Sequence, residues 1–184
     1  MLTMSQRLCN YILFKLMGWH EHTTCPLCKK YVIALAPHTS NMDFILGLLY
    51  SHAKGMNCGF LMKKQWFFWP LGYVMKALGG IPVDRSRKTS LTDQIAAIAH
   101  QADEFGLCVT PEGTRSRTSE WKKGFYYIAL KAGLPIYLYG LDYATKTIHC
   151  TSTLMPNGNI EEQMPQIKSY FAHMTGRHPQ RFTI

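Results

Sequence analysis

A histidine and an aspartate five residues apart, His38 and Asp43, are the side chains best suited to proton transfer. His38 lies in the turn-forming segment HTSN, and Asp43 falls in the first turn of the helix predicted to follow. Helical side chains lean toward the helix N-terminus, so the carboxylate can reach the imidazole and fix one ring nitrogen as a donor. The other nitrogen can then accept a proton, and the pair predicts an oriented general base.

The nucleophile that such a base would activate is expected to belong to the substrate. The sequence has no G-x-S-x-G nucleophile elbow, and Cys108 lies in an apolar run where a thiolate would be destabilised. A substrate hydroxyl is the simplest choice. An isolated H-x-x-x-x-D match is weak evidence for catalysis, because His and Asp often meet at this spacing by chance.

The second segment with chemical potential is PEGTRSR, residues 111–117. It combines Arg115 and Arg117 with a flexible glycine and two hydroxyl side chains, which are the components of an anion site. Phosphate is the natural ligand of such a site. The alternative is a solvated basic turn that ends a strand.

Apolar runs and turn signals alternate along the chain in the way that is typical of α/β proteins. The pattern predicts a single domain with a mixed, largely parallel sheet flanked by helices. HTSN and PEGTRSR each follow a predicted strand directly, and functional residues are often found in such loops. The predicted strands are 31–36, 58–62, 81–85, 107–110, 135–141 and 146–154, and the predicted helices are 41–54, 66–78 (broken or bent near Pro70), 90–104, 125–131 and 160–173.

The chain is expected to divide into a lead-in, residues 1–30, and the domain proper, residues 31–184. The lead-in should hold an amphipathic helix followed by a hairpin-like segment. This helix could lie in a membrane interface or pack on the core, and the periodicity does not choose between these alternatives. Asn10 and Lys15 interrupt its apolar run and no cleavage site follows, so it does not resemble a secretion signal. No stretch is apolar for long enough to span a bilayer.

The net charge of +9, from 20 Lys and Arg against 11 Asp and Glu, predicts an anionic partner. A membrane surface, a phosphorylated carrier and RNA all fit this charge. Nucleic acid is disfavoured because the aromatic run 66–69 is continuous and does not alternate with cations.

The six cysteines are scattered through the chain, which favours a reducing compartment. Cys25 and Cys28, with His20 and His22 just upstream, have the residue types of a zinc ligand set. A plain turn before the strand at 31–36 explains the segment better, because the two histidines are too close to the two cysteines for the usual ligand spacing.

Four segments together resemble one family. HTSNMD and PEGTRSR, in this order, resemble the catalytic and acceptor-binding blocks of the glycerol-3-phosphate and 1-acylglycerol-3-phosphate (lysophospholipid) acyltransferase superfamily. GGIPVDR, residues 79–85, and GLPIYLYGLDY, residues 133–143, resemble two further blocks of that family. Four blocks in order are difficult to obtain by chance.

The resemblance implies a role for each matching residue. His38 would deprotonate the acceptor hydroxyl and Asp43 would orient it. No metal or bound cofactor is implied, because the thioester donor is already activated. The residues that would bind substrate are Asn41, Arg85, Glu112, Gly113, Thr114 and Arg115, with Pro135 shaping the acyl-donor side.

The function implied by the resemblance is transfer of a fatty acyl group from acyl-coenzyme A or an acyl carrier protein to a lysophospholipid-like acceptor such as 1-acylglycerol-3-phosphate. The expected partners include an anionic membrane surface, with the protein peripheral on the cytoplasmic face of a membrane. Two alternatives stay open. One is a non-catalytic lipid- or phosphate-binding module of the same fold, and the other is an acyltransferase for a non-glycerol acceptor such as an amino lipid.

Overall fold

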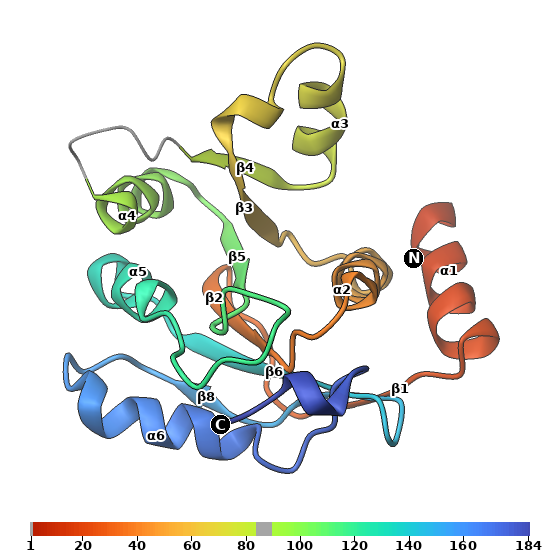
Figure 1. The fold of residues 1–184 in the computed structure, drawn as a ribbon. Helices are drawn as coiled ribbons and strands as arrows, with labels where there is room; N and C mark the ends of the chain where they lie inside the picture. The colour runs from red at the N-terminus through yellow and green to blue at the C-terminus, as the bar shows by residue number, and fades with distance from the viewer. Residues whose placement is uncertain (1, 84–89) are drawn as a thin grey trace.

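An apolar run that ends at a proline forms the central strand of the fold, β2 (Lys30–Ala36). The structure, a computed structural model, describes residues 2–83 and 90–184. It places β2 between β5 (Phe105–Val109) and β6 (Ile136–Asp142), both parallel to it. The described strands form an 8-stranded sheet in the order β1-β7-β6-β2-β5-β3-β4, with β8 beside β6 (Figure 1).

The outer strands make the sheet mixed, as predicted. On one side of β2, β5 pairs in parallel with β3 (Gly59–Lys63), which pairs in parallel with β4 (Gly80–Val83). On the other side, β6 pairs antiparallel with β7 (Thr147–Cys150) and β8 (Thr153–Leu154). The predicted strand at 146–154 is therefore two short strands. β1 (His20–Thr23), which the sequence did not predict, pairs in parallel with β7.

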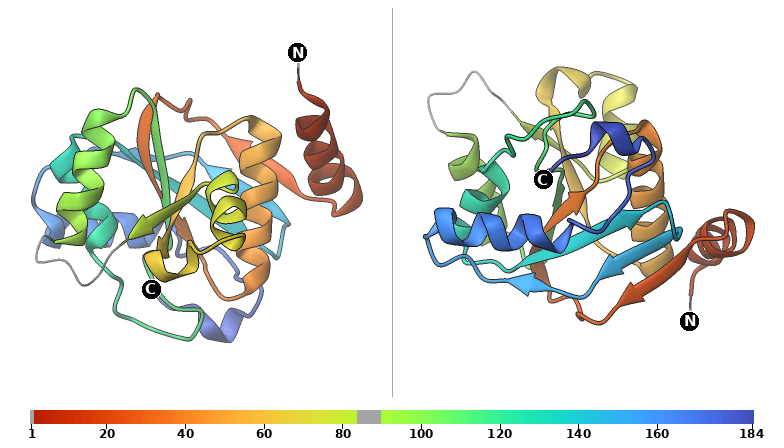
Figure 2. Two further views of the ribbon diagram at one scale, coloured as in Figure 1. Left: turned by 90° about the horizontal axis from the view of Figure 1, so that it is seen from above. Right: turned by 60° about the horizontal axis from the view of Figure 1, so that its bottom comes forward.

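Helices cover both faces of the sheet. Figure 2 shows α2 (Asn41–Lys54) on one face and α4 (Leu91–Gln101), α5 (Gly124–Ala132) and α6 (Ile160–Tyr170) on the other. The alternation of side chains along β2 explains how a wholly apolar strand serves both layers. Tyr31, Ile33 and Leu35 pack toward α2. Val32, on the opposite face of the strand, packs toward α5.

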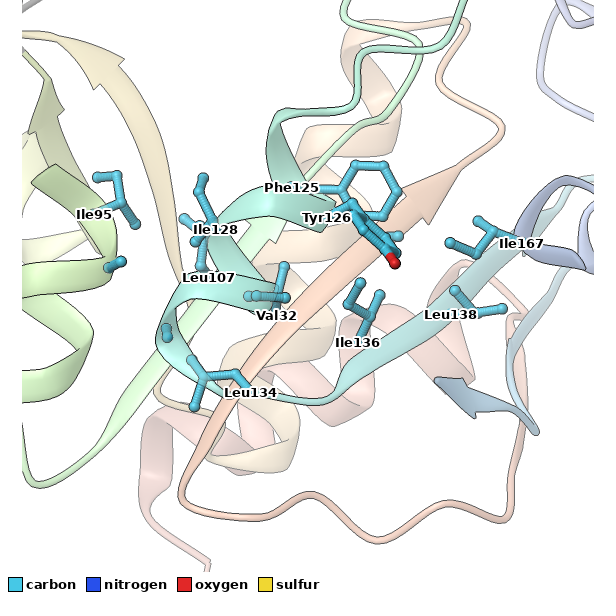
Figure 3. Packing of buried hydrophobic residues seen from close by; sticks show 14 of the residues in the cluster. Val32, Ile95, Leu107, Phe125, Tyr126, Ile128, Leu134, Ile136, Leu138 and Ile167 are labelled. Atoms are coloured by element: carbon cyan, nitrogen blue, oxygen red, sulfur yellow. The ribbon is translucent and has the colours of Figure 1, made fainter. Parts of the chain in front are cut away.

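The core between the sheet and the α4–α6 layer is packed from several elements (Figure 3). Phe125, Tyr126 and Ile128 of α5 lie over Val32 and Leu107 of the two central strands, and all five are at most 2% exposed. Complete burial of a large apolar side chain stabilises the folded state by roughly 1.5–3 kcal/mol. This layer therefore holds the central strands, and the loops that leave them, in fixed positions.

The starts of α2 and α3 are set by the residues directly before them. Ser40 is the N-cap of α2, because its hydroxyl accepts from the Met42 N–H while the Asp43 carboxylate accepts from the Ser40 N–H in a capping box. The segment 66–78, predicted as a helix broken or bent near Pro70, is broken there. A 3₁₀ turn, Lys64–Trp66, comes before the proline, and α3 (Leu71–Ala77) begins directly after Pro70, which disfavours a continuous helix through its position.

The amphipathic helix of the lead-in is present as α1 (Met4–Asn10), continued by a π-helical turn, Tyr11–Leu16. Its inner face packs on the domain through the buried Leu13, and Asn10 donates to the Ala53 carbonyl of α2 at 2.9 Å. Its outer face keeps large apolar side chains in solvent, at Leu2, Met4, Leu8, Tyr11 and Leu16. No described helix is both long and apolar enough to cross a bilayer.

Candidate active site

The polar groups of the site lie at the carboxyl ends of three neighbouring strands. β5, β2 and β6 are parallel and adjacent, so their carboxyl ends lie side by side. β2 leads into HTSN, β5 leads into PEGTRSR and β6 ends just before Tyr143. Segments that are far apart in the sequence therefore meet here, which is the usual position of a ligand site in an open α/β sheet.

His38 and Asp43 are in contact, as their spacing predicted. His38 Nδ1 lies 3.3 Å from Asp43 Oδ2, an ion-pair contact rather than a well-aligned hydrogen bond. The His38 side chain is 18% exposed and the Asp43 side chain is fully buried. The second ring nitrogen of His38, Nε2, is therefore the one that can serve a substrate.

The Asp43 carboxylate is fixed from several directions. Its Oδ2 accepts from the backbone N–H groups of Thr39 at 2.7 Å and Ser40 at 2.8 Å, and its Oδ1 accepts from the Tyr143 hydroxyl at 2.5 Å. Burial by itself would raise the Asp43 pKa, but the contacts with His38, Tyr143 and these N–H groups lower it below the usual range. The carboxylate is therefore charged and immobile beside the imidazole.

Glu112 has a role that the sequence did not suggest. Its Oε2 accepts from the His38 backbone N–H at 2.7 Å, and its side chain is 4% exposed. Burial raises the pKa of Glu112 to about 7, although the bond from His38 opposes the rise. Glu112 was expected to bind substrate, and its contact in the structure is with the backbone of His38, which it holds in place.

An apolar cavity of 1280 Å³ opens beside His38. It is larger than the roughly 300–1,000 Å³ of ordinary small-molecule sites. Apolar side chains from both layers line it, including Phe44 and Leu48 of α2, Phe60 of β3 and Ile128 of α5. His38 is one of several polar residues in this lining, so a ligand held in the cavity would lie beside the imidazole.

The predicted substrate-binding residues are only partly assembled. Asn41, Gly113, Thr114 and Arg115 line the cavity together with His38. Pro135 comes directly before β6, at the end of that strand away from His38, and does not line the cavity. Arg85 lies outside the described residues.

Tyr143 is a site residue that sequence reasoning missed. It belongs to the segment GLPIYLYGLDY, but no role was assigned to it. Burial, followed by the neighbouring Asp43, raises the Tyr143 pKa, so the hydroxyl keeps its proton and acts as a donor. Its position shortly after the predicted strand 135–141, like that of HTSN after 31–36, is a sequence signal that could have identified it.

The cysteine and histidine residues of the lead-in do not gather into a cluster. All six cysteines are free, and Cys28 Sγ donates to the Lys30 carbonyl. His22 packs against His149, with ring centroids 5.7 Å apart. Within the residues that the structure describes, no group of three or more His, Cys, Asp or Glu side chains is placed to hold a metal ion.

The fold and the site define a member of one protein family. The model of the family described as Acyltransferase matches residues 19–139, which include the loops that carry His38, Asp43 and Arg115. The chain therefore belongs to the acyltransferase family.

Three relatives share the printed description 1-acyl-sn-glycerol-3-phosphate acyltransferase. The protein from Saccharomyces cerevisiae is 34% identical over 119 residues, 60% of this chain and 38% of its own. The protein from Cocos nucifera is 32% identical over 110 residues, 56% of this chain and 35% of its own. The protein from Limnanthes douglasii is 32% identical over 124 residues, 63% of this chain and 41% of its own. The matched part of the chain thus spans less than half the length of these relatives.

The fold has a counterpart among solved structures. The crystal structure of the 1-acyl-sn-glycerophosphate (LPA) acyltransferase PlsC from Thermotoga maritima superposes with a TM-score of 0.63. The match covers 90% of this chain and 74% of that chain at 16% sequence identity. At this identity the likeness establishes the fold.

Proposed function

We propose that the chain transfers a fatty acyl group from a thioester donor to the free hydroxyl of 1-acyl-sn-glycerol 3-phosphate. The observation that carries the proposal is the position of His38, which is oriented by a buried, charged Asp43 and lines a large, mainly apolar cavity. The printed names of the three relatives support this acceptor. Acyl-coenzyme A and an acyl carrier protein both supply a suitable thioester.

The proposed reaction uses His38 as a general base and then as a general acid. Nε2 accepts the proton of the acceptor hydroxyl as the oxygen attacks the thioester carbonyl carbon. The tetrahedral intermediate collapses, the carbon–sulfur bond breaks, and the imidazolium returns the proton to the leaving thiolate. Asp43 stabilises the imidazolium between these steps, and its charged state is favoured by the bonds from Tyr143 and the helix N-terminus.

The apolar cavity is the proposed site of the acyl chain. Each methylene moved from water into an apolar site contributes about 0.8 kcal/mol, so a long chain is held strongly by the lining side chains. We place the carbonyl end of the chain at His38, because this lining residue is the proposed base for attack on the carbonyl carbon.

Attachment to a membrane surface is proposed through the outer face of α1 and of the π-helical turn that continues it. Leu8 is 59% exposed and Leu16 is 72% exposed, although both are large apolar side chains. Lys15 and Arg7 add positive charge to this helix. A short amphipathic helix with these features binds in the interfacial region of an anionic bilayer, and we place the protein peripherally on the cytoplasmic face.

The test is thioester turnover. Free thiol release is followed with palmitoyl-coenzyme A and, separately, with a palmitoylated acyl carrier protein, with and without lysophosphatidic acid. The wild type is compared with His38→Ala and with the control His52→Ala. His52 is an exposed residue of α2 whose ring contacts the Leu48 carbonyl.

Acceptor-dependent release is expected for the wild type and for His52→Ala, and its loss is expected for His38→Ala. The donor that supports release identifies the thioester. Absence of release from a folded wild-type protein with either donor would refute this function and favour a non-catalytic lipid- or phosphate-binding module.

A further inference from the structure

A second, polar pocket adjoins the apolar cavity and is bordered by four arginines. Its volume is 630 Å³. Arg115 and Arg117 come from the loop after β5, and Arg177 and Arg181 come from the C-terminal segment. Figure 2 shows this C-terminal segment, in dark blue, beside the loop after β5. The two C-terminal arginines lie outside the residues matched to the family, which end at 139.

The C-terminal segment is attached to the catalytic loop and is not a loose tail. The His178 backbone N–H donates to Thr39 Oγ1 at 3.1 Å, and Arg181 Nη1 reaches the Thr39 carbonyl at 3.4 Å. Upstream, the Tyr143 N–H donates to the Thr175 carbonyl at 2.8 Å. Thr39 is fully buried and follows His38 directly, so the arginines are positioned by the same loop that carries the base.

The arginine charges are not neutralised within the described part of the chain. No carboxylate of the described residues lies within ion-pair distance of Arg115, Arg117, Arg177 or Arg181. Four guanidinium groups around one pocket repel each other and create a strong positive field, which an anion would relieve. The first turn of α2, at Asn41, also borders the pocket and adds the positive end of the helix dipole.

We propose that Arg177 and Arg181 bind a phosphate monoester of a substrate, completing a site of which Arg115 and Arg117 form the other half. This inference rests on the proposed function, because it assigns the pocket to a substrate of the acyl transfer. A phosphate monoester carries up to two negative charges and several acceptor oxygens, and guanidinium groups bind such groups in bidentate geometry.

The position of the pocket favours the acceptor as the source of the phosphate. The pocket and the apolar cavity share Asn41, Arg115 and Ser116 in their linings. A molecule with its phosphate among the arginines and its hydroxyl at His38 therefore needs only a short linker, such as glycerol. The donor also carries phosphate groups, so the experiment has an arm for each source.

The kinetic test uses Arg177→Gln, Arg181→Gln and the double variant in the full chain. The control is Lys29→Gln, which removes one positive charge from an exposed position. Lys29 directly precedes β2, at the end of that strand away from His38. Loss of a charge-assisted hydrogen bond is expected to raise KM about tenfold or more per arginine, with kcat nearly unchanged. Arg177→Lys should recover part of the loss, since it keeps the charge but not the planar fork.

The affected substrate identifies the source. A raised KM for lysophosphatidic acid at unchanged KM for palmitoyl-coenzyme A assigns the site to the acceptor. A raised KM for palmitoyl-coenzyme A alone assigns it to phosphates of the donor. If both KM values stay within the range of Lys29→Gln, the proposal is overturned.

A binding measurement without any donor separates this proposal from the proposed function. Calorimetric titration of the chain with sn-glycerol 3-phosphate should show binding that glycerol does not show and that Arg177→Gln weakens about tenfold or more. This result would stand even if no acyl transfer were found. Equal binding of sn-glycerol 3-phosphate by the wild type and a folded Arg177→Gln protein would refute the site, whatever the outcome for activity.

Discussion

The Tyr143 hydroxyl donates a hydrogen bond to Asp43 Oδ1 across 100 residues of sequence. Asp43 uses its other oxygen, Oδ2, for His38 and for two backbone N–H groups. Both carboxylate oxygens are therefore occupied, and the plane of the carboxylate is fixed relative to the imidazole. We infer that Tyr143 positions the general base through Asp43 and does not contact substrate.

Removal of this hydroxyl should slow the chemical step. In Tyr143→Phe we expect kcat to fall about tenfold at nearly constant KM, because a hydrogen bond to a charged group contributes roughly 1.5–3 kcal/mol. The Asp43 pKa should rise when this bond is lost, so the loss of kcat that follows protonation of Asp43 should begin at a higher pH than in the wild type. Tyr127→Phe, at an exposed position on α5, is the control. An unchanged profile and kcat for Tyr143→Phe would exclude a positioning role.

The Glu112 carboxyl should make stability depend on pH. Its pKa is about 7 in the folded protein against an ordinary value of 4.5. Between these two pH values only the folded state keeps the Glu112 proton. The stabilisation that this group contributes is therefore fully present below pH 4.5 and is lost as pH rises through 7. The loss should be at most about 3 kcal/mol in the free energy of unfolding.

Urea denaturation at several pH values measures this effect. In Glu112→Gln the free energy of unfolding should fall less steeply with rising pH, since the amide does not titrate. In Glu120→Gln, at an exposed site, it should fall as it does in the wild type. If the wild type and Glu112→Gln have parallel pH profiles, Glu112 does not have a raised pKa.

Gly47 of α2 offers a way to shorten the apolar cavity. It lines the cavity, and a Cβ added there would meet no atom within 4 Å. Gly47→Ala should therefore stabilise the protein by about 1 kcal/mol through helix propensity. Gly47→Leu should occupy the space of about two methylenes and lower kcat/KM for palmitoyl-coenzyme A about tenfold, while octanoyl-coenzyme A is affected much less.

The matched control for chain length is Ala97→Leu, at an exposed position on α4. It should leave the ratio of the two donors unchanged. If Gly47→Leu also leaves this ratio unchanged, the acyl chain does not lie along α2.

The exposed apolar face of α1 should govern membrane binding. In the double variant Leu8→Gln, Leu16→Gln we expect the partition coefficient onto phosphatidylglycerol-containing vesicles to fall about tenfold or more, because two large apolar side chains no longer enter the interface. Ile98→Gln, which replaces an exposed apolar side chain on α4, should bind as the wild type does. Co-sedimentation with vesicles gives the partition coefficients, and equal values for the double variant and the wild type would contradict the role of α1.

The sequence by itself determined the local part of the site. His38 and Asp43 belong to one loop and the helix turn that follows, so their contact depends only on backbone geometry within a few residues. The apolar run of β2, the glycine that ends α2 and the periodicity of α4 were also readable, because each signal lies within one element. The short polar strand β1 was not, because it has no apolar alternation and forms only by pairing with β7.

Only the tertiary structure decided which distant groups reach this pair. Glu112 contacts His38 across 74 residues and Tyr143 contacts Asp43 across 100, because β5 and β6 flank β2 in the sheet. Strand order depends on the packing of whole elements, which residue spacing does not encode. The same holds for Arg177 and Arg181, which reach the site through a C-terminal segment bonded to Thr39.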